Sequence, residues 1–103
     1  MRRGDVYWCD LGPTVPPHPV VLLSRDSSYR ARRRATVALV TSTVRGLPIE
    51  IALGQANGLQ DGSVVNVDEI YTVRTDQLRE RMGALDAQQL GQLGAALRFA
   101  LAL

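Results

Sequence analysis

Closely spaced turn-forming residues divide the first three quarters of this chain into short apolar runs. Glycine, proline, asparagine and aspartate interrupt it at Gly12-Pro13, at Pro16 to Pro19, at Asn57-Gly58 and at Asp61-Gly62. The runs between these breaks have the length of β-strands and are shorter than ordinary helices. The spacing therefore predicts a β-rich protein made of several successive strands.

The predicted strands cover residues 6–11, 20–24, 35–43 and 48–53, followed by one or two strands over 63–67 and 69–74. Val20 to Ser24 is almost continuously apolar, which predicts a strand that is buried on both faces. Residues 48–53 alternate apolar side chains with Glu50, which predicts a strand with one exposed face.

Helical periodicity begins only near residue 75. Thr75 has the character of an N-cap and predicts a short helix that ends near Gly83. Asp86 then precedes apolar residues spaced by three and four from Leu90 to Leu101, which predicts a longer C-terminal helix. We expect one domain over residues 1–103, mainly β with a C-terminal helix, whose strands curl into a small, partly open barrel.

Several functional classes are excluded by what the sequence lacks. No apolar run reaches the roughly 18 residues of a membrane span. Cys9 is the only cysteine and His18 the only histidine, so we expect no disulfide, no metal site and a cytosolic protein. The motifs of serine hydrolases, P-loop enzymes and zinc proteases are absent. We expect no cofactor.

The basic residues are distributed unevenly. All 12 are arginines, and residues 1–46 hold eight of them against three aspartates, which favours an anionic partner for the first half. The densest cluster is Tyr29 to Arg34. It is typical either of a solvated loop or of a phosphate-contacting surface, and the sequence leaves both interpretations open.

Five motifs occur in a fixed order along nearly the whole chain. They are Arg3-Gly4-Asp5-Val6-Tyr7-Trp8, Pro19 to Asp26 (PVVLLSRD), Val40-Thr41-Ser42-Thr43, Val65 to Val73 (VNVDEIYTV) and Arg81-Met82-Gly83-Ala84-Leu85. Together they resemble the MazF/PemK family of bacterial toxins. The resemblance implies an SH3-like barrel, a homodimer, and sequence-specific, metal-independent cleavage of single-stranded RNA that a cognate antitoxin neutralises. In that reaction the RNA's own 2′-OH attacks the adjacent phosphorus.

The resemblance transfers to individual residues unevenly. Thr41 matches the family's hydroxyl residue at the scissile phosphate, and Ser42 and Thr43 are weaker candidates beside it. His18 stands before Pro19, where the family normally has its catalytic arginine. Histidine changes charge near neutral pH and can act as general base or acid. A role in substrate binding alone, or no role, remains open.

Other candidates are weaker. Arg25 is either a second source of positive charge or part of a structural turn with Asp26. Glu69 lies where relatives have an amide that reads a base, and a carboxylate there would favour bases with an amino group. Four aromatic residues are candidate platforms for base stacking, although a strand must bury either Tyr7 or Trp8. The four are Tyr7, Trp8, Tyr29 and Tyr71.

Two other functions remain as alternatives. The first is a non-catalytic binding protein of the same fold, similar to the gyrase poison CcdB. The second is an inactive toxin that only binds its antitoxin.

Overall fold

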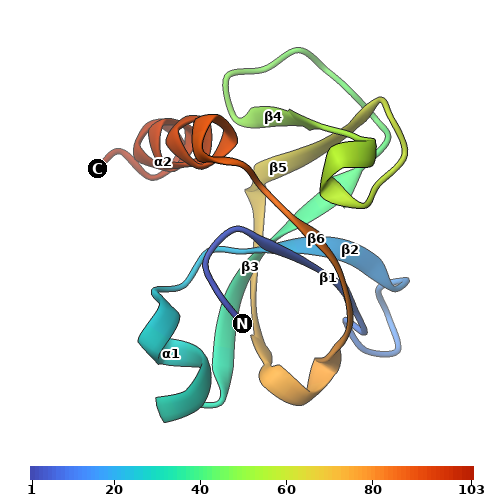
Figure 1. The fold of residues 1–103 in the computed structure, drawn as a ribbon, viewed down its shortest axis with the longest axis vertical. Coiled ribbons are helices and arrows are strands. Elements are labelled where there is room, and N and C mark those ends of the chain that lie inside the picture. Colours follow the sequence, from blue (N-terminus) through green and yellow to red (C-terminus); the bar gives the residue numbers. More distant parts are fainter.

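The computed structural model describes all of residues 1–103 and contains six strands, two α-helices and two 3₁₀ turns. In chain order the elements are β1 (Asp5–Cys9), β2 (His18–Leu22), α1 (Asp26–Ala31), β3 (Arg34–Thr41), β4 (Glu50–Leu53), η1 (Gln55–Asn57), β5 (Ser63–Arg74), η2 (Thr75–Gln77), β6 (Leu78–Ala84) and α2 (Ala87–Leu101). Figure 1 shows a strongly curled sheet with α2 beside one end of it and α1 at the other.

All six strands form one antiparallel sheet in the order β4-β5-β3-β2-β1-β6, so β4 and β6 are its edges. The curl brings the turn after η1 against β6 although no ladder joins them. A Cβ atom added at Gly58 would overlap the carbonyl oxygen of Met82, and one at Gly83 would overlap that of Asn57. Glycine permits this close backbone approach. The expected mainly β, partly open barrel with a C-terminal helix is therefore confirmed.

Two groups of buried side chains lie on opposite faces of the sheet. One contains Val21 and extends to Leu93 of α2, and the other contains Leu22 and extends to Tyr29 of α1. Neighbouring residues of β2 thus point into different cores, because successive strand side chains face opposite ways. The prediction that this run is buried on both faces is confirmed.

The C-terminal helix begins where the sequence predicts. The carboxylate of Asp86 accepts a hydrogen bond from the backbone N–H of Gln89, which caps the helix. Asn57 is buried and donates to both the carbonyl oxygen of Ala84 and the side chain of Gln89. This amide therefore ties η1, the end of β6 and α2 together and fixes the seam of the barrel.

One local prediction was wrong, and one element was missed. The helix expected from Thr75 to Gly83 is only the 3₁₀ turn η2, and the residues that follow form β6. Pairing of β6 with β1 outweighs the weak local helix signal, since it satisfies the backbone along a sheet edge. The helix α1 was not predicted, and part of the arginine cluster lies in it and in the turn before β3.

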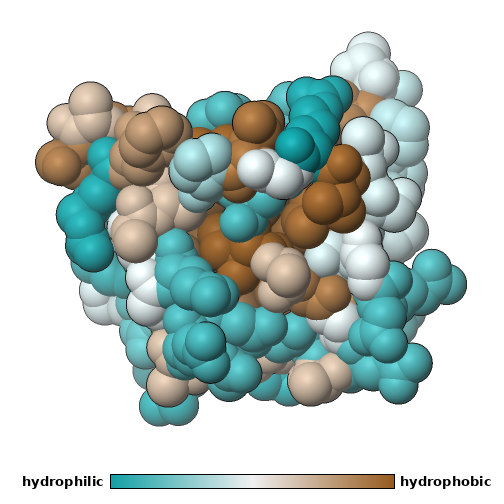
Figure 2. Space-filling view, turned by 90° about the horizontal axis from the view of Figure 1, so that it is seen from above, coloured by the Kyte–Doolittle hydropathy of each residue, from teal (hydrophilic) through white to brown (hydrophobic).

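No helix is long and apolar enough to cross a membrane. Seen from above the view of Figure 1, apolar surface gathers near the middle of this face and hydrophilic side chains occupy its lower edge (Figure 2). Large apolar side chains are exposed at several positions of the chain, which are Met1, Trp8, Val44, Leu47, Phe99, Leu101 and Leu103.

Candidate active site

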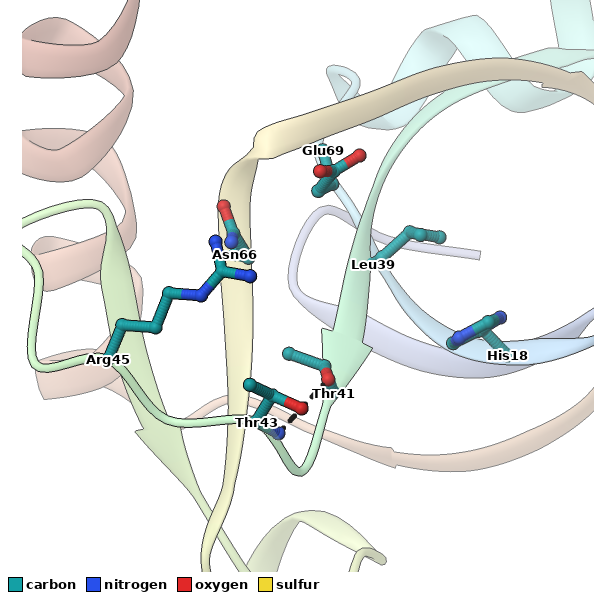
Figure 3. A pocket seen from close by; sticks show the side chains of 7 residues that line it. All are labelled: His18, Leu39, Thr41, Thr43, Arg45, Asn66 and Glu69. Carbon is teal, nitrogen blue, oxygen red and sulfur yellow. Dashed lines mark hydrogen bonds between the residues drawn. The ribbon is translucent and has the colours of Figure 1, made fainter. Parts of the chain in front are cut away.

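A pocket of about 310 Å³ lies at the end of β3 and brings together residues from four parts of the chain. Figure 3 shows its lining, which consists of His18, Leu39, Thr41, Thr43, Arg45, Asn66 and Glu69. Only one of the seven is apolar. Four of the expected site residues, His18, Thr41, Thr43 and Glu69, therefore line one pocket.

The hydroxyl of Thr41 lies where β3 ends and the chain turns. Its Oγ1 accepts a hydrogen bond of 3.1 Å from the backbone N–H of Thr43. This bond organises the turn and orients the hydroxyl oxygen, since threonine readily bonds to backbone two residues on. The hydroxyl hydrogen stays available to donate to an oxygen in the pocket.

A bulge in β5 brings two further polar side chains to the pocket. Ala38 pairs with Ile70, but the next residue, Leu39, pairs with Asn66, so residues 67–69 have no partner on β3. The Asn66 side chain supports this bulge by accepting a hydrogen bond from the backbone N–H of Asp68 at 2.9 Å. Bulges commonly redirect side chains next to active sites. Here Asn66 and Glu69 both line the pocket.

His18 is the first residue of β2 and is partly buried. The antiparallel pairing of Val20 with Leu39 places His18 level with Thr41 on the neighbouring strand. The Nδ1 atom lies 2.7 Å from the carbonyl oxygen of Pro16. Because a carbonyl oxygen only accepts, Nδ1 carries the proton, and Nε2 of the neutral ring is free to accept one.

Arg45 reaches the pocket from the loop between β3 and β4 (Figure 3). The Glu50 carboxylate accepts hydrogen bonds from the backbone N–H groups of Arg45, at 3.1 and 3.2 Å, and Leu47, at 3.1 Å. Partial desolvation acts to raise the pKa of Glu50, but these backbone bonds prevail and hold it below its ordinary value. The carboxylate is therefore charged at neutral pH and holds the loop.

A second, more apolar pocket of about 610 Å³ adjoins the first and shares His18 and Thr41 with it. Its lining includes Ser42 and Trp8, whose exposed fraction is 40%. His18 and Thr41 thus lie between the polar pocket and the second pocket, which is lined by the indole of Trp8.

Two other predicted residues lie elsewhere. Arg25 is exposed at the start of α1 and lines neither pocket. The prediction of Tyr29 as a stacking platform is wrong, because its ring is buried and its hydroxyl donates to the carbonyl oxygen of Ser24 at 2.7 Å. Burial, with a smaller contribution from Asp26, raises the pKa of Tyr29 to about 12.

The arginine cluster lies at the opposite end of β3 from Thr41. The strand begins at Arg34 and ends at Thr41, which is roughly 23 Å at about 3.3 Å per residue. A pocket of about 720 Å³ at α1 is lined by Arg30, but three of its seven lining residues are apolar, against one of seven in the smaller pocket. The smaller pocket is the better candidate, since convergent polar side chains mark a binding site more reliably than volume does.

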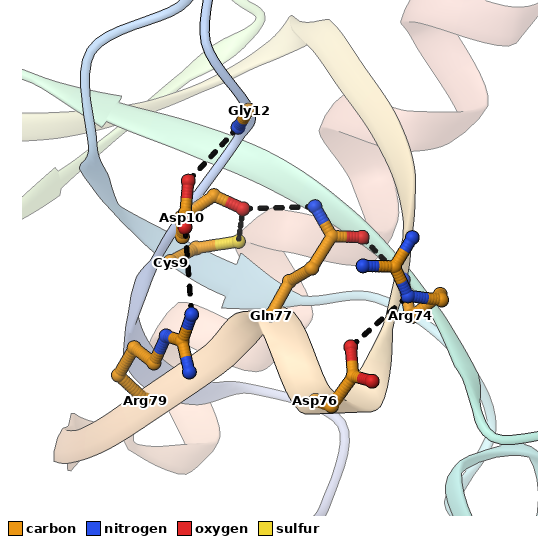
Figure 4. A network of polar contacts seen from close by, with 7 residues as sticks. All are labelled: Cys9, Asp10, Gly12, Arg74, Asp76, Gln77 and Arg79. Carbon is orange, nitrogen blue, oxygen red and sulfur yellow. Dashed lines mark hydrogen bonds and ion pairs between the residues drawn. The ribbon is translucent and has the colours of Figure 1, made fainter.

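A polar network holds the corner between β5 and β6 (Figure 4). Asp10 accepts hydrogen bonds from the backbone N–H of Gly12 and, at 3.4 Å, from Arg79. The first of these is the main reason that the pKa of Asp10 lies below its ordinary value. Any resulting stabilisation is present above the ordinary pKa and is lost as pH falls through the lowered one. Cys9 beside it is fully buried, and burial followed by the charge of Asp10 raises its pKa to about 11.

Sequence reasoning missed Arg45 and Asn66. Arg45 lies in a loop without a motif of its own, and only Glu50, five residues later, hints that the loop is held. Asn66 lies within the motif from Val65 to Val73, where the sequence predicts only a strand residue. Its signal is an asparagine between two valines and two residues before Asp68, a pattern in which the asparagine side chain bonds nearby backbone.

A partly open antiparallel barrel with a C-terminal helix and a polar pocket at a strand end defines a class of small β-barrel proteins. The family model described as "PemK-like, MazF-like toxin of type II toxin-antitoxin system" matches residues 2–101. The chain belongs to this family.

Two curated relatives cover nearly the whole chain. "Probable endoribonuclease MazF5" of Mycobacterium tuberculosis is 36% identical over 95% of this chain and 90% of its own length. "Endoribonuclease EndoA" of Bacillus subtilis is 29% identical over 100% of this chain and 96% of its own. Both names assign cleavage of RNA to those relatives.

Solved structures agree with the fold. "Mycobacterium tuberculosis toxin MazF-mt6" has a TM-score of 0.88 and 32% identity, and the match covers 96% of this chain and 97% of that one. A structure described as "Endoribonuclease in complex with its cognate antitoxin from Mycobacterial species" has a TM-score of 0.89 and 30% identity, covering 100% and 96%.

Proposed function

We propose that this protein is the toxin of a toxin–antitoxin pair, a sequence-specific endoribonuclease that cleaves single-stranded RNA in the cytosol without a metal ion. The observation that carries the proposal is the pocket at the end of β3, where an imidazole, a hydroxyl and a guanidinium converge in a member of the MazF-like family. Relatives that match nearly the full chain are named endoribonucleases, which supports the same activity here.

The reaction uses a nucleophile that the substrate itself supplies. The 2′-oxygen forms a bond to the adjacent phosphorus while the bond to the 5′-oxygen of the next nucleotide breaks. The products are a 2′,3′-cyclic phosphate and a 5′-hydroxyl. The protein must align these atoms, remove the 2′ proton, protonate the leaving oxygen and stabilise the added negative charge on phosphorus.

The pocket residues suit these tasks. Nε2 of His18 is free to take the 2′ proton, and its imidazolium can return a proton to the leaving oxygen. Thr41 donates its hydroxyl hydrogen to a phosphate oxygen. Thr43 holds Thr41 through its backbone N–H, and its own hydroxyl lines the same pocket.

The two adjoining pockets accommodate the bases that flank the scissile phosphate. Glu69 and Asn66 line the polar pocket, where the carboxylate favours a base that presents an amino group. Ser42 and the exposed indole of Trp8 line the second pocket, where the indole offers a stacking surface. Base preference at these two positions is the basis of sequence specificity in this proposal.

Two protein partners complete the proposal. A second copy of the chain covers part of the exposed apolar surface and forms a homodimer. A cognate antitoxin with an acidic segment competes with RNA for the basic first half of the chain, because carboxylates and phosphates attract the same arginines. A related structure is described as a complex with its cognate antitoxin, which supports this second partner.

The test is cleavage of a mixed single-stranded RNA by the purified protein, with and without EDTA. We expect discrete products with 2′,3′-cyclic phosphate ends and equal rates in both conditions. An RNA with 2′-deoxyribose at the mapped cleavage site should stay intact, because its internal nucleophile is missing. The matched control is the His18→Ala variant prepared in the same way, which guards against a contaminating nuclease.

Other outcomes would contradict parts of this proposal or assign the protein to one of the alternatives. Cleavage that EDTA abolishes contradicts the metal-independent reaction. Inhibition of gyrase supercoiling without RNA cleavage assigns the protein to the CcdB-like alternative. Binding to the antitoxin with neither activity indicates an inactive toxin. Sedimentation as a monomer at tens of micromolar would contradict the homodimer.

A further inference from the structure

The polar pocket contains one arginine, Arg45, and no carboxylate forms an ion pair with its guanidinium. The three ion pairs of the protein join Arg74 to Asp76, Arg79 to Asp10, and Arg81 to Asp5. Arg45 takes part in none of them, and no hydrogen bond is formed by its guanidinium. Its donors are therefore free for a ligand in the pocket.

The scissile phosphate, which the proposed function places at His18 and Thr41 on the edge of this pocket, needs a positive charge near it. The charge of Glu69, which also lines the pocket, opposes an approaching anion, and the hydroxyls of Thr41 and Thr43 are neutral. A neutral His18 ring adds no positive charge before it accepts a proton. Arginine suits the remaining task, because its planar guanidinium can give two parallel hydrogen bonds to a phosphate.

The loop that carries Arg45 is held by Glu50 rather than left free. The carboxylate lies at the first residue of β4 and binds the backbone N–H groups of Arg45 and Leu47. The backbone N–H of Glu50 in turn donates to the carbonyl oxygen of Leu47 at 3.0 Å. In the middle of this turn Gly46 adopts φ +70°, which glycine permits without strain. The charged side chain of Glu50 is thus engaged by backbone, which leaves the guanidinium unpaired.

We propose that Arg45 is the residue that contacts the scissile phosphate with positive charge, and that Glu50 is a positioning residue that holds Arg45 at the pocket. The inference rests on the proposed RNA cleavage and extends it to two residues. It assigns the loop between β3 and β4 to substrate binding.

The first test compares Arg45→Gln with Arg32→Gln, an exposed arginine that lines neither pocket. Arg45→Gln should lower kcat about 10- to 100-fold, as expected for loss of a charged hydrogen-bond donor, whereas Arg32→Gln should change it less than about twofold. Arg45→Lys should recover part of the loss because it keeps the charge. Equal effects of the two glutamine variants would overturn the role of Arg45.

A double-mutant cycle tests Glu50. Glu50→Ala should lower kcat in the same direction as Arg45→Gln, and the double variant should be no slower than Arg45→Gln alone, because both changes remove one interaction. Glu50→Gln keeps the size and one acceptor oxygen and should retain more activity than Glu50→Ala. Thermal unfolding of each variant verifies folding. Additive losses in the cycle would overturn the positioning role.

Binding separates this inference from the proposed function. Affinity for a single-stranded oligodeoxynucleotide, which lacks every 2′-hydroxyl and cannot be cleaved by this reaction, is measured for the wild type, Arg45→Gln and Arg32→Gln. If the wild type does not cleave RNA but only Arg45→Gln weakens binding, the phosphate contact stands and the enzymatic proposal is wrong. If the wild type cleaves RNA and Arg45→Gln changes neither binding nor kcat, the inference is wrong and the enzymatic proposal stands.

Discussion

The two ends of β3 carry very different chemistry. At the Thr41 end, side chains from β2, β3, β5 and the loop between β3 and β4 converge on one pocket, which contains a single arginine. At the Arg34 end, three more arginines lie within the four preceding residues, all exposed and without an ion pair. High charge density marks one end, and convergence of different functional groups marks the other. For catalysis at phosphorus the second property matters more, because it positions groups that move protons and stabilise charge.

The largest effect that distinguishes the two ends is expected at His18. His18→Ala should lower the cleavage rate about 10²- to 10⁴-fold, the usual range for a lost general acid or base. His18→Arg should retain activity. Rates of single-turnover cleavage provide the measurement, and an unchanged rate for His18→Ala would contradict the role.

A smaller loss is expected from the hydroxyl at the strand end. Thr41→Val keeps the shape of the side chain and removes one neutral hydrogen bond, typically worth about 0.5–1.5 kcal/mol, so cleavage should slow roughly 2- to 13-fold. Thr41→Ser should restore most of the rate. Both variants are compared in kcat and in thermal midpoint, because Thr41 also accepts the backbone N–H of Thr43. A loss as large as that of His18→Ala would show that the hydroxyl does more than bind phosphate.

At the arginine end a stability effect is expected instead of a catalytic one. Arg33 has φ +54° in the turn between α1 and β3, where its carbonyl oxygen accepts the backbone N–H of Thr75. A left-handed conformation costs a side-chain-bearing residue about 1–2 kcal/mol, and glycine avoids that cost at an entropic penalty of roughly 0.5–1 kcal/mol. Arg33→Gly should therefore stabilise the fold by roughly 0–1.5 kcal/mol in urea unfolding. Clear destabilisation would show that the Arg33 side chain itself supports the turn.

The smallest effect is expected from neutralising the cluster. A variant with Arg30→Gln, Arg32→Gln and Arg34→Gln should cleave a short RNA at a rate within about twofold of the wild type, since none of these side chains lines the polar pocket. The measurement is kcat at moderate salt. A loss comparable to that of Arg45→Gln would favour the phosphate-contacting interpretation of the cluster and remove the contrast between the two ends.

Much of the fold follows from local patterns in the sequence. Turn residues and apolar alternation predicted five strands close to their positions, and Asp86 with its apolar stripe predicted α2. The sixth strand was missed, because Leu78 to Ala84 shows little alternation and becomes a strand only by pairing with β1. Such a tertiary preference leaves no local signature.

The site was predictable in part for a similar reason. His18 and Thr41 stand at recognisable motif positions, and the strand register brings them level. Arg45 lines the pocket because Glu50 holds the loop, and Asn66 and Glu69 line it because β5 has a bulge. The folded loop and the bulge both depend on tertiary contacts. The density of arginines in the sequence also made the cluster from Tyr29 to Arg34 a candidate phosphate-contacting surface, but it lies at the other end of β3 from the pocket.

The most direct test of the account is to locate a bound substrate analogue on the protein. Backbone amide NMR signals would be followed while a single-stranded oligodeoxynucleotide is added, which has no 2′-hydroxyl and is therefore not cleaved. We predict that the largest shifts occur at Thr41, Thr43, Arg45 and Asn66, with small changes at residues 30–34. Shifts confined to residues 30–34, with the pocket unaffected, would contradict the assignment of the active site to the Thr41 end of β3.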